Sequence, residues 1–173
     1  MLKTFIGLDY GSDSVRALLV DQNGRELAAA VHNYRRWSEG KFCDAVKHQF
    51  RQHPLDYLEG LETVIREVLK NQDASAVAGI AVDATCSTMC AVDGNGVPLA
   101  LKPGFESDPD AMFVLWKDHT SIAEADEINA LAHSWEVDYT KYSGGTYSCE
   151  WAWAKMFYFF TYAITTIYAF FLF

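Results

Sequence analysis

One short segment near the start of the chain places an acidic residue beside several hydroxyl residues. Asp9 ends an apolar run, and Gly11-Ser12-Asp13-Ser14 follows before the next apolar run begins at Val15. Glycine permits close backbone approach, serine hydroxyls are donors, and successive turn amides form a concavity suited to phosphate oxygens. An aspartate beside phosphates is repelled unless a cation lies between, which predicts that Asp9 holds a hydrated Mg²⁺. The same residues also fit a plain β-turn in which Asp9 caps its own backbone.

The turn at residues 11–14 lies between two predicted strands. Residues 4–10 and 15–21 are apolar runs that predict a hairpin. Asn23-Gly24 predicts a second tight hairpin, which leads into a strand over residues 26–34. Three antiparallel strands therefore open the chain, and they would hold Asp9 at a strand end.

A helix and a fourth strand are predicted next. After an irregular stretch over residues 35–53, Pro54 begins a predicted helix of about 17 residues. Its apolar stripe consists of Leu58, Leu61, Ile65, Val68 and Leu69. The apolar run 77–83 predicts a covered strand, which we expect to lie parallel to an earlier one because it returns after a helix. The sequence thus predicts an α/β fold with a mixed sheet and flanking helices.

The segment after the fourth strand predicts a further hairpin and a helix. Residues 88–92 and 97–101 flank the turn 93–96, which contains two glycines. The cluster Ser107-Asp108-Pro109-Asp110 can cap a helix that runs to about Lys117.

A third helix is predicted from a capping box. Ser121 and Glu124 have that spacing, and an apolar stripe follows, formed by Ile122, Ala125, Ile128, Leu131 and Ala132. A Gly-Gly loop over residues 142–149 leads to the start of another helix at 150–155. No repeat or linker interrupts residues 1–155, which we interpret as one domain.

Composition excludes several classes of protein. The 173 residues carry a net charge of −9 and a pI near 4.9, which argues against nucleic acid as a partner. Four cysteines show no CxxC pair, and the histidines show no metal-ligand spacing, so neither a zinc site nor a disulfide framework is indicated. Residues 1–10 do not form a secretory signal, because Asp9 interrupts the apolar run. We therefore expect a cytoplasmic protein; oligomeric state is left open.

Residues 156–173 differ from the rest of the chain. They contain nine of its 25 aromatic residues and no charged residue. As a helix this stretch would reach about 27 Å, close to the roughly 30 Å hydrocarbon core of a bilayer. Its Phe, Tyr and Thr content is unlike that of usual anchors. An aberrant terminus, a buried helix or strand of an incomplete domain, and a membrane segment are the three interpretations, of which the membrane segment is disfavoured.

The opening hairpins resemble the phosphate-binding hairpin of the actin, heat-shock-protein-70 and hexokinase superfamily, whose domains have a ribonuclease H-like fold. No GxxxxGK[ST] loop occurs. Five segments narrow the resemblance to the FGGY carbohydrate kinases, and within them to the members that phosphorylate L-ribulose. They are GLDYGSDSVRALLVD at 7–21, QHPLDYLEGLE at 52–62, GIAVDATCSTMCAVDGNGVPL at 79–99, LWKDHTSIAEADEIN at 115–129 and YSGGTYSCEWAWAK at 142–155. The resemblance ends at Met156, so residues 1–155 are identified as an incomplete first domain.

The resemblance implies a reaction and a set of site residues. The reaction is transfer of the ATP γ-phosphate to the terminal hydroxyl of L-ribulose, with Mg²⁺ required, as in arabinose catabolism. Phosphates and metal would meet Asp9, Gly11, Ser12, Asp13 and Ser14, with Asp9 as the metal ligand. The ketose would bind near Asp83, Thr85, Cys86, Trp116, Lys117, Tyr142 and Glu150. A flat aromatic to cover the carbon chain and polar partners for each hydroxyl suit a polyol.

Each of these residues also has a structural interpretation. Asp83 can end a strand, Trp116 can fill the core, and Glu150 can cap a helix. Lys117 fits a solvated surface charge, and Cys86 with Cys90 fits small buried hydrophobes.

The resemblance further implies that the catalytic aspartate and the second, nucleotide-binding domain have no counterpart in this sequence. We therefore expect a chain that is inactive as a kinase alone. Two other functions stay open: another FGGY sugar or polyol kinase, acting on D-xylulose or D-ribulose for example, and a non-catalytic module attached to a membrane.

Overall fold

The computed structural model describes residues 3–163 and 170–172, which form two compact units. Unit 1 comprises Met1–Lys41 and His53–Thr85, and unit 2 comprises Phe42–Gln52 and Cys86–Phe173. Each unit is described by itself.

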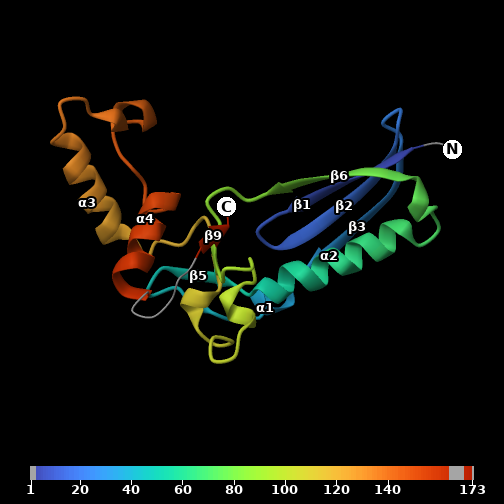
Figure 1. Cartoon of the computed structure of the whole chain (residues 1–173), viewed down its shortest axis with the longest axis horizontal. Helices are drawn as coiled ribbons and strands as arrows, with labels where there is room; N and C mark the ends of the chain where they lie inside the picture. Colours follow the sequence, from blue (N-terminus) through green and yellow to red (C-terminus); the bar gives the residue numbers. More distant parts are fainter. Residues whose placement is uncertain (1–2, 164–169, 173) are drawn as a thin grey trace. The chain divides into compact units, whose positions relative to one another are not determined.

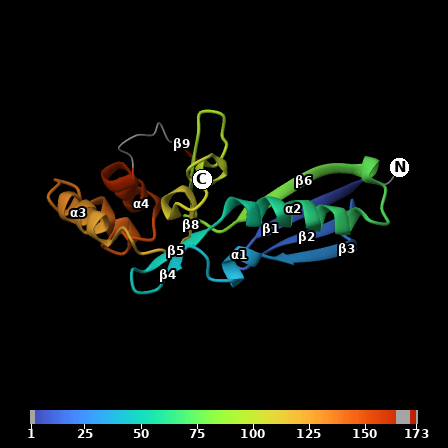
Figure 2. The same ribbon diagram turned by 90° about the horizontal axis from the view of Figure 1, so that it is seen from below.

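Unit 1 is built on a four-stranded mixed sheet with the order β3-β2-β1-β6 (Figures 1 and 2). The strands are β1 (Thr4–Tyr10), β2 (Ser14–Asp21), β3 (Glu26–Asn33) and β6 (Val77–Ala84). β1, β2 and β3 pair antiparallel in chain order, and β6 pairs parallel with β1. Both predicted hairpins and the parallel return of the fourth strand are therefore confirmed.

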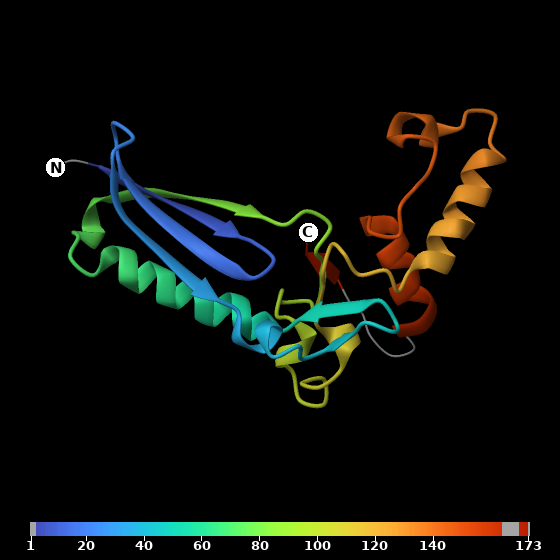
Figure 3. The same ribbon diagram turned by 180° about the vertical axis from the view of Figure 1, so that it is seen from behind.

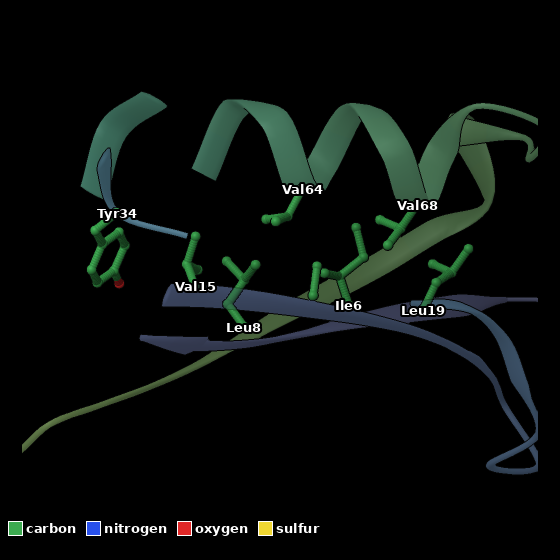
Figure 4. Close-up of a cluster of buried hydrophobic side chains, with 8 residues drawn as sticks. Ile6, Leu8, Val15, Leu19, Tyr34, Val64 and Val68 are labelled. Carbon is green, nitrogen blue, oxygen red and sulfur yellow. The ribbon is translucent and has the colours of Figure 1, made fainter. Parts of the chain in front are cut away.

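Helix α2 (Pro54–Leu69) covers one face of this sheet (Figure 2). Because side chains alternate along a strand, every second residue of β1 and β2 faces the helix. Figure 4 shows the resulting core, in which Ile6, Leu8, Val15 and Leu19 point toward Val64 and Val68 of α2. The predicted helix is confirmed, but its stripe is displaced: Leu58 is exposed, and Val64 takes the buried position.

A capping histidine and an ion-pair link to α1 hold the start of α2. His53 Nδ1 accepts a hydrogen bond from the Leu55 N–H, so this histidine is the N-cap. Burial is the main cause that lowers the His53 pKa, which keeps the ring neutral and able to accept. The short helix α1 (Arg35–Ser38) is tied to α2 by Arg36, whose guanidinium donates to Asp56 and Glu59. A 3-10 turn, Ala74–Ala76, precedes β6.

The opposite face of the sheet is open in unit 1. Phe5, Leu18 and Val31 are exposed there, although all three are apolar. β6 is also exposed, with Ile80 at 59% and Val82 at 64%, so the prediction of a covered strand is wrong. The reason is geometric: Ile80 and Val82 lie in register with Ile6 and Leu8 on the helix side, but the backbone of α2 lies against β2 and β3.

Unit 2 is made of short elements (Figure 3). Its strands are β4 (Cys43–Asp44), β5 (Gln49–Gln52), β7 (Cys90–Val92), β8 (Phe113–Val114) and β9 (Phe170–Leu172). Its α-helices are α3 (Ile122–His133) and α4 (Ala152–Tyr158), which contact each other. Its described residues also form three 3-10 helices, Leu99–Leu101, Pro109–Ala111 and Tyr139–Ser143, and a π-helix, Phe159–Ala163.

Several local predictions for residues 35–53 and for unit 2 are wrong. Residues 35–53 are not irregular, since they contain α1, β4 and β5. The helix expected from Ser107 to Lys117 is one 3-10 turn capped by Asp108, after which β8 pairs with β5. The backbone N–H and C=O groups of β8 form hydrogen bonds with β5, in place of the bonds that a helix would have provided.

The two helices predicted after residue 121 are confirmed, but their first and last residues differ from the prediction. Ser121 makes no capping bond; its hydroxyl donates to the Cys149 carbonyl instead. α4 begins at Ala152 and continues past Lys155 to Tyr158. The turn at 93–96 forms, but 99–101 is a 3-10 helix, and β7 pairs with β9.

The first residues of the apolar tail pack into unit 2. Phe159 is buried in a cluster with Met89 and Val114. Among the described residues, no helix has the length and apolar content needed to span a bilayer. Residues 164–169 and 173 of the tail lie outside the described part of the chain.

Gly60 allows us to test the close packing of α2 on the sheet. An added Cβ at Gly60 would lie 2.6 Å from Val15 Cγ1. At an exposed helix position Gly→Ala stabilises by about 1 kcal/mol, but here the clash should give a net loss of about 1–3 kcal/mol in Gly60→Ala. Urea unfolding followed by circular dichroism measures this. The control is Gly94→Ala, where no atom lies within 4 Å; equal stability of the two variants would contradict the packing.

Candidate functional site

Asp9 lies at the carboxyl end of β1 on the open face of the unit 1 sheet. The antiparallel register sets it opposite Arg16 of β2, and the parallel register sets it beside Asp83 of β6. Arg16 Nη1 donates to Asp9 Oδ2 at 3.2 Å, and the two side chains are 62% and 48% exposed. An exposed ion pair of this kind adds little stability. Asp9 is therefore accessible, as the phosphate and metal interpretation requires.

The turn after β1 is closed by the backbone. The Gly11 N–H donates to the Ser14 carbonyl at 2.9 Å, so this amide is engaged within the hairpin. Asp13 is also engaged, because its Oδ1 accepts from the Trp37 indole N–H at 2.7 Å and its carbonyl accepts from the Tyr34 N–H. Of the predicted phosphate-binding residues, Gly11 thus has a structural partner within the hairpin, and Asp13 has two partners after β3.

A hollow of about 500 Å³ lies on the open face of the sheet. Small residues form its floor, among them Gly7, Ala29 and Ala81, and Asp9, Arg16 and Asp83 lie along it. Mg²⁺ is usually held by one or two carboxylates together with water and phosphate oxygens. Asp9 and Asp83, adjacent in the parallel register, fit that requirement. In the described part of the chain no cluster of three or more His, Cys, Asp or Glu residues is arranged for a metal.

The sugar-binding residues predicted in unit 2 come from three segments. Trp116 is 40% exposed, and its backbone N–H donates to Thr88 Oγ1 at 3.1 Å, so the interpretation of Trp116 as a core residue is wrong. Glu150 Oε1 lies 2.8 Å from His119 Nε2. The Lys117 ammonium lies 4.8 Å from the centre of the Phe50 ring. Trp116, Lys117 and Glu150 are thus held in defined positions.

Tyr142 has a looser setting than these residues. It is 78% exposed, and its ring is 5.0 Å from the Lys141 ammonium. Glu150 precedes α4, which begins at Ala152, so it is not the N-cap; that position is Trp151.

The residues predicted between positions 83 and 86 divide between the two units. Asp83 Oδ1 accepts from the Ala84 N–H, and the Thr85 N–H donates to the Tyr10 carbonyl, both within unit 1. Cys86 belongs to unit 2 and is exposed, so its interpretation as a buried hydrophobe is wrong. That interpretation is confirmed for Cys90, where burial raises the pKa of the thiol to about 12.

Three buried charges beside these segments were missed by the sequence reasoning. Asp118 Oδ2 accepts from Arg51 Nε at 2.9 Å and from the Phe50 N–H at 2.7 Å, and Arg51 and Asp118 are both fully buried. Lys155 is buried as well. The available signal was position: Asp118 lies between Lys117 and His119, and Lys155 ends the last matching segment.

Several solved structures similar to this chain are sugar and polyol kinases. A xyloylose kinase from Brucella ovis matches with a TM-score of 0.72 at 19% identity, covering 92% of this chain and 30% of that one. A glycerol kinase from Plasmodium falciparum, solved with ADP, matches with a TM-score of 0.67 at 13% identity, covering 94% and 29%. At such identities the likeness establishes the fold, which is that of the FGGY kinases with their actin- and hexokinase-like architecture.

Ribulokinases are among the sequence relatives of this chain. A ribulokinase from Vibrio parahaemolyticus is 55% identical over 155 residues, which are 87% of this chain and 27% of the relative. A ribulokinase from Halalkalibacterium halodurans is 39% identical over 162 residues, covering 89% and 29%. No protein-family model matches the chain. The chain is thus similar to ribulokinases over most of its own length, and it spans somewhat more than a quarter of the length of these relatives.

The buried pair gives a stability prediction. Asp118→Asn leaves the Arg51 guanidinium buried without its full counter-charge, so we expect a loss of about 3–5 kcal/mol in the free energy of unfolding. The control is Glu62→Gln, which breaks the exposed pair between Glu62 and Arg66 and should change stability far less. Chemical denaturation measures both. Similar small losses in the two variants would show that the buried pair is not a structural anchor.

Proposed function

We propose that this chain supplies part of an ATP-dependent kinase that phosphorylates the terminal hydroxyl of L-ribulose to give L-ribulose 5-phosphate in the cytoplasm. The observation that supports it most is the placement of Asp9, Arg16 and Asp83 together at the carboxyl ends of β1 and β6. Ligands bind at that edge in α/β sheets. The 55% identity to a ribulokinase supports the choice of reaction.

The proposed phosphate side lies in unit 1. Asp9, with Asp83 beside it, would hold Mg²⁺, which neutralises charge on the transferring phosphate. Arg16 orients Asp9 through their ion pair. The Ser12 hydroxyl would donate to a phosphate oxygen, whereas Ser14 is only 5% exposed and would support the turn from within. Gly11 and Asp13 keep the turn in shape, through the hairpin hydrogen bond and the bond to Trp37.

The proposed sugar side lies chiefly in unit 2. Trp116 would cover the carbon chain of the ketose, because a half-exposed indole provides a flat apolar surface. Glu150, oriented by His119, would accept hydrogen bonds from sugar hydroxyls. Lys117, Tyr142 and Cys86 of unit 2 and Thr85 of unit 1 are the further candidates. Specificity between ketoses would come from pairing each hydroxyl, because an unpaired buried polar group is costly.

We further propose that the chain does not complete phosphoryl transfer alone. The reaction needs a phosphate clamp, an adenosine pocket and a base near the accepting hydroxyl. This chain spans about 27% of the Vibrio ribulokinase, and we assign no base within it. A coupled assay of the purified chain with ATP, Mg²⁺ and L-ribulose should show no ribulose-dependent ADP formation. Sustained ADP formation that requires the ketose would contradict this.

Sugar choice is tested by calorimetry with the whole chain. We expect L-ribulose to bind more tightly than D-xylulose, D-ribulose or glycerol, and Trp116→Ala to weaken binding about tenfold or more, through loss of the stacked surface. Trp135→Ala is the matched control, since Trp135 is another half-exposed tryptophan of unit 2. Tighter binding of D-xylulose, D-ribulose or glycerol would indicate that this chain belongs to a kinase with a different sugar specificity. Absence of any sugar binding would refute the sugar side.

A further inference from the structure

Lys155 on α4 is buried and fully hydrogen-bonded. The residue is only 1% exposed to solvent. The ammonium donates to the carbonyls of Ser87 at 2.9 Å, Leu115 at 2.8 Å and Trp116 at 3.1 Å. An ammonium has three donors, so all of them are used. One side chain thereby joins α4 to two segments that are far apart in the sequence.

Both joined segments belong to the proposed sugar side. Both backbone polar groups of Trp116 are hydrogen-bonded: its N–H donates to Thr88 Oγ1, and its carbonyl accepts from Lys155. Ser87 has a φ of 56°, a left-handed conformation that is costly for a residue other than glycine. Its carbonyl accepts from Lys155 as well. Lys155 therefore holds Trp116 and the strained residue next to Cys86.

The charges around Lys155 indicate that it holds these two segments in place and does not serve chiefly as a stabilising ion pair. Its direct partners are three neutral carbonyls, while Asp118 and Glu150 provide more distant attraction and Arg51 provides repulsion. Burial lowers the pKa of Lys155 to about 8, so the ammonium is still largely protonated at neutral pH. Burying a charge without a carboxylate partner costs stability, and an apolar side chain would avoid that cost.

We propose that Lys155 is a positioning residue of the sugar side, which sets Trp116 and the loop 86–88 in the arrangement that receives the ketose. The inference rests on the proposed function. It adds that the affinity for the sugar depends on a residue that need not touch it. Three carbonyls brought to one ammonium fix the relative position of the two segments, whereas apolar packing alone leaves them able to slide.

Hydrogen exchange tests the positioning without any sugar. In Lys155→Met, which keeps side-chain length, backbone amides in residues 86–90 and 113–118 should exchange about tenfold faster or more, because local opening is no longer opposed by the ammonium. Lys102→Met is the control; Lys102 pairs with Asp93 on the 93–96 turn and does not contact these carbonyls. Unchanged exchange at 86–90 and 113–118 in Lys155→Met would overturn the proposal.

Calorimetry with L-ribulose tests the consequence. Lys155→Met should lower the affinity of the full chain about tenfold while Lys102→Met does not, because a loosened site must be ordered on binding. Wild-type affinity in a folded Lys155→Met would overturn the positioning of the sugar side. If the wild-type chain binds no ketose, the proposed function fails, and hydrogen exchange still decides whether Lys155 positions the segments. Should Lys155→Met not fold, Thr88→Val removes the other backbone anchor of Trp116 and is expected to lower the affinity in the same direction.

Discussion

The packing of α2 on one face of the β1-β2-β3 sheet determines what the other face presents. Ile6 and Leu8 of β1 are buried under the helix, so Asp9, the next residue, must lie on the opposite, open face. The pairing register then sets Arg16 and Asp83 beside it. A slip of one residue would exchange the two faces and bury the carboxylate. The apolar core under α2 thus specifies the position of the acidic group.

Unit 2 uses a different means to hold its site. Its strands are two to four residues long, too short to supply a large apolar core of their own. Buried charges help to hold these short elements together: Arg51 and Asp118 form an ion pair, and Lys155 donates to three carbonyls. Such groups favour one arrangement because any other leaves a buried charge or polar group without partners. The arrangement they favour holds Trp116 and Glu150 in defined positions.

The sequence predicts unit 1 well because its signals are local and periodic. Two tight turns, alternating strands and a helix with a proline at its start lead to the observed order of elements. Unit 2 is predicted poorly, since β5 and β8 depend on partners about sixty residues apart, and no local pattern encodes that pairing. The exposure of β6 was missed for a related reason, because an apolar strand does not reveal how far a neighbouring helix extends.

The candidate site shows the same division. Motif resemblance selected residues 9–14, which the structure places at the carboxyl end of β1 and in the turn after it, but only the strand register brings Asp83 next to Asp9. Trp116 and Glu150 were named from the resemblance, whereas Lys155 and Asp118, which hold their segment, carry no signal in composition or spacing. A buried charge has to be found from its contacts.

The most direct test of the account is a titration of the ¹⁵N-labelled chain with Mg²⁺ and ATP, followed by amide chemical shifts. The account predicts magnesium-dependent shifts concentrated at residues 9–14 and 83–84, and their loss in Asp9→Asn. Shifts that are absent at saturating nucleotide, or that persist unchanged in Asp9→Asn, would contradict a metal and phosphate site at this edge of the sheet.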